Sequence, residues 1–412
     1  MTEKIEKIKT GIENSGIADA TAAVYETDSS WIKSKRYMYF ASMVIPGVPI
    51  ISAYLAGETG NGLWLWSLFI VFYGILPILD QLSGLDAANP SDELVEKLKD
   101  ERYYVYILYA ATIAHWFALI YMAYTVSHYD FSWFSILGGA LSIGLANGLA
   151  LVAGHELGHK VNDKGQVFFA KLALAVSGYG HFFIEHNKGH HKDVATPEDP
   201  ATARFGETIY KFVKREIPGA FKRAWELESA RLHRLGKSEW SLSNDIIQPA
   251  LITITAYTLM LAYFGPVMIP FLAIGAAYGW WQLTGANYIE HYGLMRERDA
   301  NGRYERCQAR HSWNSNHKIS NLVLLHLQRH SDHHAHPTRP YQVLRDYPEV
   351  PSLPSGYPFM LALAMFPSAW FSLMNPKVTN WAEGDMNKVN IDPDIRDEVF
   401  KRYHNPKTAK AA

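Results

Sequence analysis

The sequence contains a single cysteine, Cys307, among 412 residues. One thiol cannot form a disulfide framework within the chain, and it can build neither a cysteine-rich zinc site nor an iron–sulfur centre. Any metal bound by this chain therefore needs nitrogen or oxygen ligands. Histidine is the candidate, because 18 are present and most of them lie between residues 155 and 336.

Charged residues are absent from five long stretches of the sequence. A helix needs roughly 20 apolar residues to cross a bilayer, and four of the stretches have about that length. The fifth is 44 residues long and is divided by Gly265 and Pro266, so it can supply two crossings. The pattern predicts an all-α integral membrane protein with six transmembrane helices; the alternative is a soluble protein with buried helices. The stretches are 37–56, 63–79, 103–126, 133–154 and 246–289.

The distribution of Lys and Arg predicts the orientation of the chain. The connections 57–62 and 127–132 and the turn at Gly265 carry neither residue, whereas all other connections do. By the positive-inside tendency, both termini and both long polar regions are expected in the cytoplasm. The chain is nearly neutral, with 39 Lys+Arg and 40 Asp+Glu, and we expect no nucleic-acid partner. The predicted organisation is a cytoplasmic N-terminal arm (1–36), four transmembrane helices (37–154), a cytoplasmic insertion (155–245), two further transmembrane helices (246–289) and a cytoplasmic cap (290–412).

Two shorter features refine this picture. Gly144 and Gly148 lie four residues apart in the fourth apolar stretch, which is typical of helices that approach each other closely; the alternative is a channel lining. The apolar run 359–373 is cut by Pro367 and is too short to cross a bilayer. We expect this run to lie on the membrane or to pack against the cap.

Histidines gather in three clusters and one single position at the ends of the apolar stretches. The first cluster is His155-Glu156-Leu157-Gly158-His159, in which residues four apart share one helix face and can grip one ion. His186 and His190 repeat this spacing, so His191 should point elsewhere. Imidazole suits iron, copper, nickel and zinc, and nine ligands exceed the capacity of one ion, so we expect two ions with about four and five ligands. The candidate ligands are His155, His159, His186, His190, His191, His291, His330, His333 and His334.

Carboxylates near the clusters could hold the second nitrogen of each ligand imidazole. An acid next to a histidine points about 100° away on a helix, so each acid is expected to support a histidine of another cluster. The alternative is ordinary salt bridging with Lys188, Lys192 or Arg329. The candidates are Glu156, Glu185, Glu290, Asp193, Asp199 and Asp332. Five more histidines are predicted as hydrogen-bond partners rather than ligands: His181, His311, His317, His326 and His336.

Four segments of the sequence resemble the signature motifs of bacterial alkane 1-monooxygenases, which are membrane relatives of the fatty acid desaturases. They are H-E-L-G-H at 155, E-H-N-K-G-H-H at 185, N-Y-I-E-H-Y-G at 287 and L-Q-R-H-S-D-H-H-A-H-P at 327. The similarity extends from about residue 30 to 390. It implies a helical bundle of six transmembrane helices in the bacterial inner membrane, with a di-iron centre at the cytoplasmic end held by the nine histidines and no catalytic residue beyond these ligands.

The resemblance also implies the substrates and partners. These are a medium-chain n-alkane hydroxylated at its terminal methyl, dioxygen, and rubredoxin as electron donor with a rubredoxin reductase upstream. A rubredoxin needs four thiolates, so with one cysteine the donor must be a separate protein. The basic stretch 204–237, with nine Lys/Arg against four Glu, is a candidate docking surface, and Lys211, Arg215 and Arg223 are its proposed steering cations; the alternative is charge that only sets topology.

An alkane dissolves in the bilayer core, so a substrate tunnel should enter between helices. Aromatic residues of the second and third stretches are candidates to shape it, although simple packing is the alternative reading: Trp66, Phe69, Phe72 and Phe117. Three other functions compete. H-E-L-G-H also matches a zinc protease motif with Glu156 as general base, a related desaturase or aromatic side-chain hydroxylase would use the same metal chemistry, and a metal transporter would place its histidines within the spans.

Overall fold

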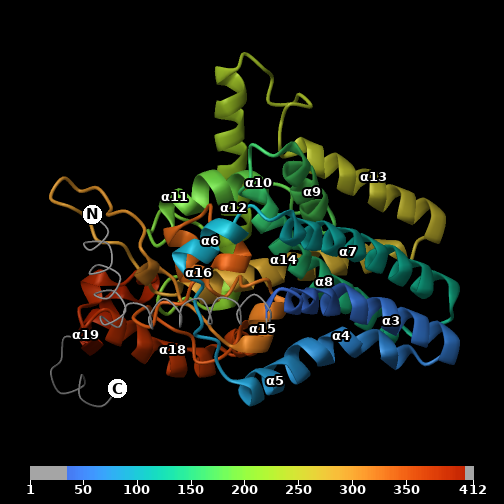
Figure 1. The fold of residues 1–412 in the computed structure, drawn as a ribbon, viewed down its shortest axis with the longest axis horizontal. Helices are drawn as coiled ribbons and strands as arrows, with labels where there is room; N and C mark the ends of the chain where they lie inside the picture. The colour runs from blue at the N-terminus through green and yellow to red at the C-terminus, as the bar shows by residue number, and fades with distance from the viewer. Residues whose placement is uncertain (1–34, 404–412) are drawn as a thin grey trace, which may run out of the picture.

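The computed structural model describes residues 35–403, so nearly all of the predicted N-terminal arm (1–36) lies outside the described residues. Within this range the regular elements are helices, joined by loops that carry four isolated β-bridges. The long apolar helices extend to one side of the molecule, and the short polar helices gather at the other end (Figure 1). The predicted all-α fold is therefore confirmed for the described residues.

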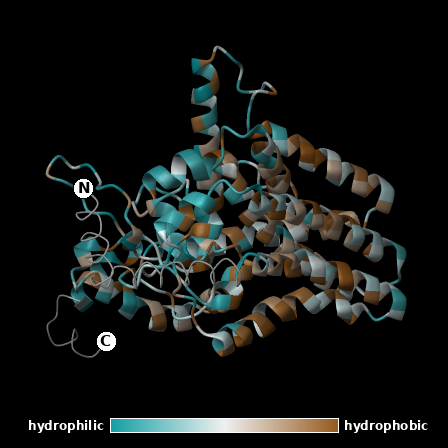
Figure 2. Cartoon of the chain, in the orientation of Figure 1, coloured by the Kyte–Doolittle hydropathy of each residue, from teal (hydrophilic) through white to brown (hydrophobic). Residues whose placement is uncertain are grey.

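Five helices are long and apolar enough to cross a membrane, and they match the first five predicted spans. Hydrophobic residues concentrate on this side of the molecule (Figure 2). The first two spans are broken locally: η1 (Met38–Met43) continues into α3 (Val44–Thr59), and η2 (Gly62–Trp66), α4 (Ser67–Ile70), the π-helix η3 (Val71–Ile75) and α5 (Leu76–Ser83) follow one another. The other three are α7 (Arg102–His128), α8 (Trp133–Gly158) and α13 (Ile247–Phe264).

The sixth predicted span corresponds to α14 (Met268–His291). This helix has 24 residues, but it is not among the five candidate spans, and its second half carries the polar residues Gln282, Thr284, Asn287 and Glu290. Its role as a span stays a prediction. The apolar run near residue 360 forms α17 (Tyr357–Ala364) and α18 (Pro367–Trp381), which are bent by 119°, and α17 packs against α14.

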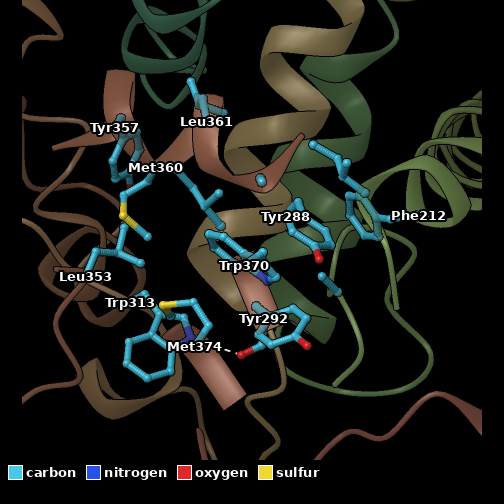
Figure 3. Packing of buried hydrophobic residues seen from close by; sticks show 14 of the residues in the cluster. Phe212, Tyr288, Tyr292, Trp313, Leu353, Tyr357, Met360, Leu361, Trp370 and Met374 are labelled. Carbon is cyan, nitrogen blue, oxygen red and sulfur yellow. Dashed lines mark hydrogen bonds between the residues drawn. The ribbon is translucent and has the colours of Figure 1, made fainter. Parts of the chain in front are cut away.

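Short helices between and after the spans cover one end of the bundle. They are held there by a large aromatic core: Tyr288, Tyr292, Trp313 and Trp370 pack together beside Met374 (Figure 3). Trp313 donates its indole N–H to the carbonyl of Tyr292 at 2.9 Å. This core fixes the end of α14, where His291 lies. The remaining helices are α6 (Asp92–Leu98), α9 (Lys164–Ala175), α10 (Phe182–Ile184), η4 (Glu185–His190), α11 (His191–Asp193), α12 (Ile209–Arg234), η5 (Ala309–His311), α15 (Lys318–Val323), α16 (His330–Ala335), η6 (Tyr341–Val343), η7 (Met386–Lys388), η8 (Pro393–Ile395) and α19 (Arg396–Tyr403).

The predicted close approach at Gly144 and Gly148 is confirmed, and the partner is α14. A Cβ atom added at Gly144 would lie 2.6 Å from the carbonyl oxygen of Gly275, and one at Gly148 would lie 2.6 Å from Cβ of Gln282. Small residues let the two backbones pack tightly. Because α8 ends in the first histidine cluster and α14 ends in His291, this contact sets the distance between two parts of the candidate site.

Replacing Gly148 by alanine is expected to destabilise the protein by about 1–3 kcal/mol, the usual cost of overpacking a tight core. Gly47→Ala is the matched control in another apolar helix, because a Cβ there would meet no atom within 4 Å. The measurement is the apparent melting temperature of each purified variant in detergent. Equal melting temperatures for the two variants would contradict the tight packing of α8 on α14.

Candidate metal centre

The four predicted histidine segments meet at one place, where the ends of two long helices reach three short ones. His155 and His159 lie at the end of α8, and His291 is the last residue of α14. The remaining candidates are carried by η4, α11 and α16: His186, His190, His191, His330, His333 and His334. Histidines separated by up to 179 positions, 155 to 334, therefore share one centre.

The nine histidines form two groups, in each of which the potential ligand atoms all lie within 4.8 Å of one another. The group of five contains His155, His159, His186, His191 and His333; the group of four contains His190, His291, His330 and His334. The four are all buried, whereas His159 and His191 in the group of five are partly exposed. The expected division into about four and five is what the geometry gives.

The pairing within the second cluster differs from the sequence prediction. His186 and His190 were expected to grip together with His191 pointing elsewhere, but His186 joins His191 in the group of five and His190 joins the group of four. The reason is the π-helical turn of η4, Glu185–His190. A π-helix bonds residue i to i+5. Residues five apart, such as His186 and His191, therefore share a face here, instead of residues four apart such as His186 and His190.

The nitrogen geometry of both groups fits a bound cation. Nε2 of His333 lies 2.9 Å from Nε2 of His155 and 3.1 Å from Nε2 of His191, and Nε2 of His330 lies 2.8 Å from that of His334 and 3.2 Å from that of His291. Two nitrogen ligands about 2.1 Å from one ion and at right angles are about 3 Å apart. A cation at each centre would satisfy all of these facing nitrogens at once.

The protonation states of the histidines also suit ligation. Burial, followed by the neighbouring imidazoles, lowers the pKa of His186, His330, His333 and His334 well below the ordinary value. These rings are therefore neutral at physiological pH and offer lone pairs to a metal. His190 differs: burial alone would lower its pKa, but the Asp199 carboxylate overrides burial and raises it.

Asp199 is the best placed of the six predicted supporting acids. Its Oδ2 accepts a hydrogen bond from Nδ1 of His190 at 2.9 Å, which leaves Nε2 of His190 aimed into the site. That Nε2 is buried and has no hydrogen-bond partner within residues 35–403. Asp199 is in turn held by the guanidinium of Arg223 at 2.7 Å, and Arg223 also pairs with Glu185. His190, Asp199, Arg223 and Glu185 thus form one continuous buried chain.

The other four acids lie in different settings. Glu156 has Oε1 3.3 Å from Nδ1 of His155 and Oε2 accepting from the backbone N–H of Tyr341 at 3.2 Å. Glu290 has Oε2 3.3 Å from Nε2 of His330. Asp193 lies 3.6 Å from Arg223. Asp332 faces away from the nine histidines, accepting from Nδ1 of His336 at 2.9 Å and from the hydroxyl of Tyr347 at 2.8 Å.

The sequence prediction gave Arg223 the wrong role. It also missed a backbone hydrogen-bond partner of His291. Arg223 was expected to steer an electron donor, yet its side chain is only 15% exposed and is committed to Glu185 and Asp199. The other two steering cations are also paired, Lys211 with Asp392 and Asp394 and Arg215 with Glu207. The carbonyl of His311, not its imidazole, lies 3.5 Å from Nδ1 of His291. Every residue has a backbone carbonyl, so a contact of this kind cannot be predicted from residue types.

A narrow apolar cavity of about 20 Å³ lies against both histidine groups. That volume is enough for one water molecule or a methyl group. Its polar lining residues are His155, His186, His330, Asn287 and Glu290. The apolar walls are Leu151, Val152, Phe182, Leu283, Ala286 and Leu327.

The four predicted tunnel aromatics all lie within the described part of the chain, and none lines this cavity. Phe72 is fully buried. Phe69 stacks on Tyr278 of α14 with ring centroids 6.1 Å apart, and Trp66 stacks on Phe134 at 4.9 Å. Phe117 is 53% exposed and stacks on Tyr121, so it lies on the outer face of α7. The tunnel role of these residues stays a prediction.

Apolar helices whose ends bring many histidines together are typical of membrane enzymes with a histidine-bound non-haem metal. Consistent with this, the fatty acid desaturase family matches residues 131–363 of the chain. The alkane 1-monooxygenase of Pseudomonas putida is 55% identical over 93% of this chain and 96% of its own length. The alkane 1-monooxygenase 1 of Alcanivorax borkumensis is 54% identical over 91% and 93%, and the alkane 1-monooxygenase of Ectopseudomonas oleovorans is 54% identical over 92% and 94%. The chain is an enzyme and belongs to the alkane 1-monooxygenase family within the desaturase-like membrane oxidoreductases.

Proposed function

We propose that this enzyme hydroxylates the terminal methyl group of medium-chain n-alkanes to 1-alkanols inside the bacterial inner membrane. The observation that carries the proposal is the pair of histidine groups, five and four, facing one narrow apolar cavity. The overall reaction consumes one alkane, one dioxygen, two electrons and two protons. One oxygen atom is inserted into a C–H bond, and the other leaves as water.

The donor set supports two non-haem iron ions as the cofactor. Imidazole suits iron, each group can hold one ion, and zinc is excluded for this reaction because it cannot change valence. Two iron ions held there would supply the reductive activation of dioxygen that no side chain can perform.

The residues of the chain position the substrate and keep the metal ligands in place. Asp199 fixes the tautomer of His190 by accepting its Nδ1 proton, which keeps Nε2 available. Leu151, Phe182 and Leu283 would hold an alkane end by apolar contact and exclude water from its methyl group. Asn287 and Glu290 line the same cavity and supply its polar atoms beside the histidines.

Electrons are proposed to come from rubredoxin, itself reduced by a rubredoxin reductase. His159 and His191 are the partly exposed ligands, and they mark where the centre lies nearest the surface. Because Lys211, Arg215 and Arg223 are paired, steering would fall to the exposed cations of the same basic stretch, such as Lys214, Arg234 and Lys237. The same charge distribution supports a cytoplasmic placement of the histidine end, with α14 as the sixth span.

A zinc protease is the weaker alternative. Its general base would be Glu156, but Oε2 of this carboxylate is engaged by the backbone N–H of Tyr341 at 3.2 Å, and Oε1 is buried beside His155. The motif histidines also share their group with three further imidazoles, whereas a catalytic zinc site keeps a position open with three protein ligands.

The test is to purify the protein, count metals per chain, and supply octane, dioxygen and a reduced rubredoxin system. Two irons per chain with formation of 1-octanol are expected. One zinc per chain with peptide hydrolysis would favour the protease instead. Oxidation of an aromatic methyl group or desaturation of an acyl chain, without octanol, would move the enzyme to another branch of the desaturase-like family.

A further inference from the structure

One buried carboxyl group beside the centre has no place in the chemistry described so far. Glu216 lies on the inner face of α12 with 2% of its surface exposed. Its Oε2 accepts a hydrogen bond from the hydroxyl of Thr284 at 2.7 Å, and its Oε1 accepts one from the amide of Asn287 at 3.2 Å. Both partners are uncharged, and both belong to α14. Carboxylates are almost never fully buried unless they are paired, so a group in this setting favours the neutral, protonated form.

Within residues 35–403 no cation forms an ion pair with Glu216, whose hydrogen-bond partners are Thr284 and Asn287. Two arginines of its own helix are committed elsewhere, Arg215 to Glu207 and Arg223 to Glu185 and Asp199. The ionisable groups that face Glu216 from other elements are Glu185 of η4, Asp199 of the loop before α12 and the phenol of Tyr179. Burial, with smaller contributions from Glu185 and Asp199, raises the pKa of Glu216 to about 7.

Asn287 connects this carboxyl group to the cavity. Its amide is bonded to Glu216 and also lines the cavity between the two histidine groups. The cavity can hold one water molecule, and the orientation of an amide can reverse so that its oxygen accepts where its nitrogen donated. A single side chain therefore separates a buried acid from the space in which the substrate methyl and dioxygen must meet.

We propose that Glu216 is the proton donor of the oxygenation reaction and acts through Asn287. Oε1–H of Glu216 passes its proton to Oδ1 of Asn287, while Nδ2 of the same amide releases one proton into the cavity. This leaves Asn287 as its imidic acid, with one hydrogen on Oδ1 and one on Nδ2, and Glu216 regains a proton from solvent. Rotation of the side chain turns Oδ1–H to the cavity and Nδ2 to Glu216; the second delivery passes a proton from Glu216 to Nδ2 and releases the one on Oδ1, which restores the amide with Nδ2 facing Glu216. Two deliveries supply the two protons that leave as water, and the two electrons come from the redox protein that donates to the centre. This proposal rests on the proposed hydroxylase function.

Failure of proton delivery has a measurable chemical signature. Dioxygen that receives two electrons without productive proton delivery escapes as hydrogen peroxide after taking protons from solvent, so alkanol formed per dioxygen consumed falls. Glu216→Gln keeps the shape but not the proton and is expected to reduce this ratio by about a hundredfold, the lower end of the usual contribution of an acid–base group. The proposal predicts that the rate of the wild-type enzyme falls as pH rises through about 7, and that the turnover of Glu216→Gln lacks this fall.

Two further variants separate proton transfer from structure. Asn287→Leu has a similar volume and keeps Glu216, and it should release peroxide as Glu216→Gln does. Thr284→Val removes the other hydrogen bond of Glu216 without cutting the route to the cavity, and it should keep wild-type coupling. Infrared spectra of the metal-free protein between pH 5 and 9 give a readout that needs no turnover. Because Glu290 is also a buried carboxyl group, the signal of Glu216 is the part of the protonated carboxyl band that titrates near pH 7 in the wild type and Asn287→Leu and is missing in Glu216→Gln.

The outcomes of these experiments test the proton relay separately from the hydroxylase function. Wild-type coupling in Glu216→Gln, or in Asn287→Leu if the first variant does not fold, would overturn the relay. Absence of the titrating band in the wild type would show that Glu216 holds no proton and would also overturn it. A wild-type enzyme that forms no alkanol at all would instead sink the hydroxylase proposal, while the infrared titration would still report on Glu216.

Discussion

His190→Ala is expected to abolish alkane hydroxylation, with a loss of roughly a thousandfold or more, because no side chain can replace the metal chemistry that its group would support. The variant should still insert in the membrane, since His190 lies at the junction of two short helices outside the apolar spans. Its group keeps three imidazoles, His291, His330 and His334, which leaves a weaker site. If the proposed pair of iron ions is correct, iron content should fall from two towards one per chain.

The measurement combines octanol formation, iron per chain and membrane yield. His233→Ala is the matched control, because its side chain is 65% exposed and lies far along α12 from both groups. Single alanine changes at His155, His291 and His334 should behave like His190→Ala. Retained turnover in any one of them would remove that residue from the ligand set.

The meeting of the nine histidines could be predicted from two features of the sequence: their spacing within each cluster and the position of each cluster at the end of an apolar stretch. Residues four apart share a helix face, and each cluster follows or precedes an apolar stretch. The division of the second cluster could not be predicted in the same way. The π-helical turn at Glu185–His190 moves His191 onto the face of His186, and no residue type in E-H-N-K-G-H announces that turn.

Charge patterns were less reliable than histidine spacing. A basic stretch in a sequence shows how many cations it holds but not which of them are paired. Asp392 and Asp394 neutralise Lys211 from a segment about 180 positions away, and Asp199 and Glu185 draw Arg223 inward. Similarly, Phe117 shares its apolar helix with buried residues, and only the packing of α7 reveals that it faces outward. Such outcomes depend on tertiary contacts that composition does not contain.

Arg223 and Asp199 also show how the protein stabilises a buried charged network next to the candidate metal ligands. Burying one charge is costly unless it is paired, and here one guanidinium serves two carboxylates while one of these carboxylates also holds His190. Burial would raise the pKa of Asp199, but His190 and Arg223 together hold it below its ordinary value. Asp199 therefore stays ionised, and the charge on it keeps the imidazole oriented.

Asp199→Asn is consequently expected to weaken iron retention and turnover by about 10- to 100-fold, the usual effect of removing a group that orients a metal ligand. The asparagine can still accept a hydrogen bond from His190, but it carries no charge to balance Arg223, so the buried pair is broken. Iron per chain after dialysis against a chelator and octanol formation at saturating iron are the measurements. Activity restored by excess iron would identify weakened binding as the cause.

Asp193→Asn is the matched control for this change. Asp193 is also an acid within reach of Arg223, but the distance is 3.6 Å and its side chain is 30% exposed, so water replaces most of what the substitution removes. We expect wild-type iron retention and turnover in this variant. If Asp199→Asn behaved like Asp193→Asn, the carboxylate of Asp199 would be an ordinary salt-bridge partner of Arg223, and the orientation of His190 would have to come from packing against its neighbouring imidazoles.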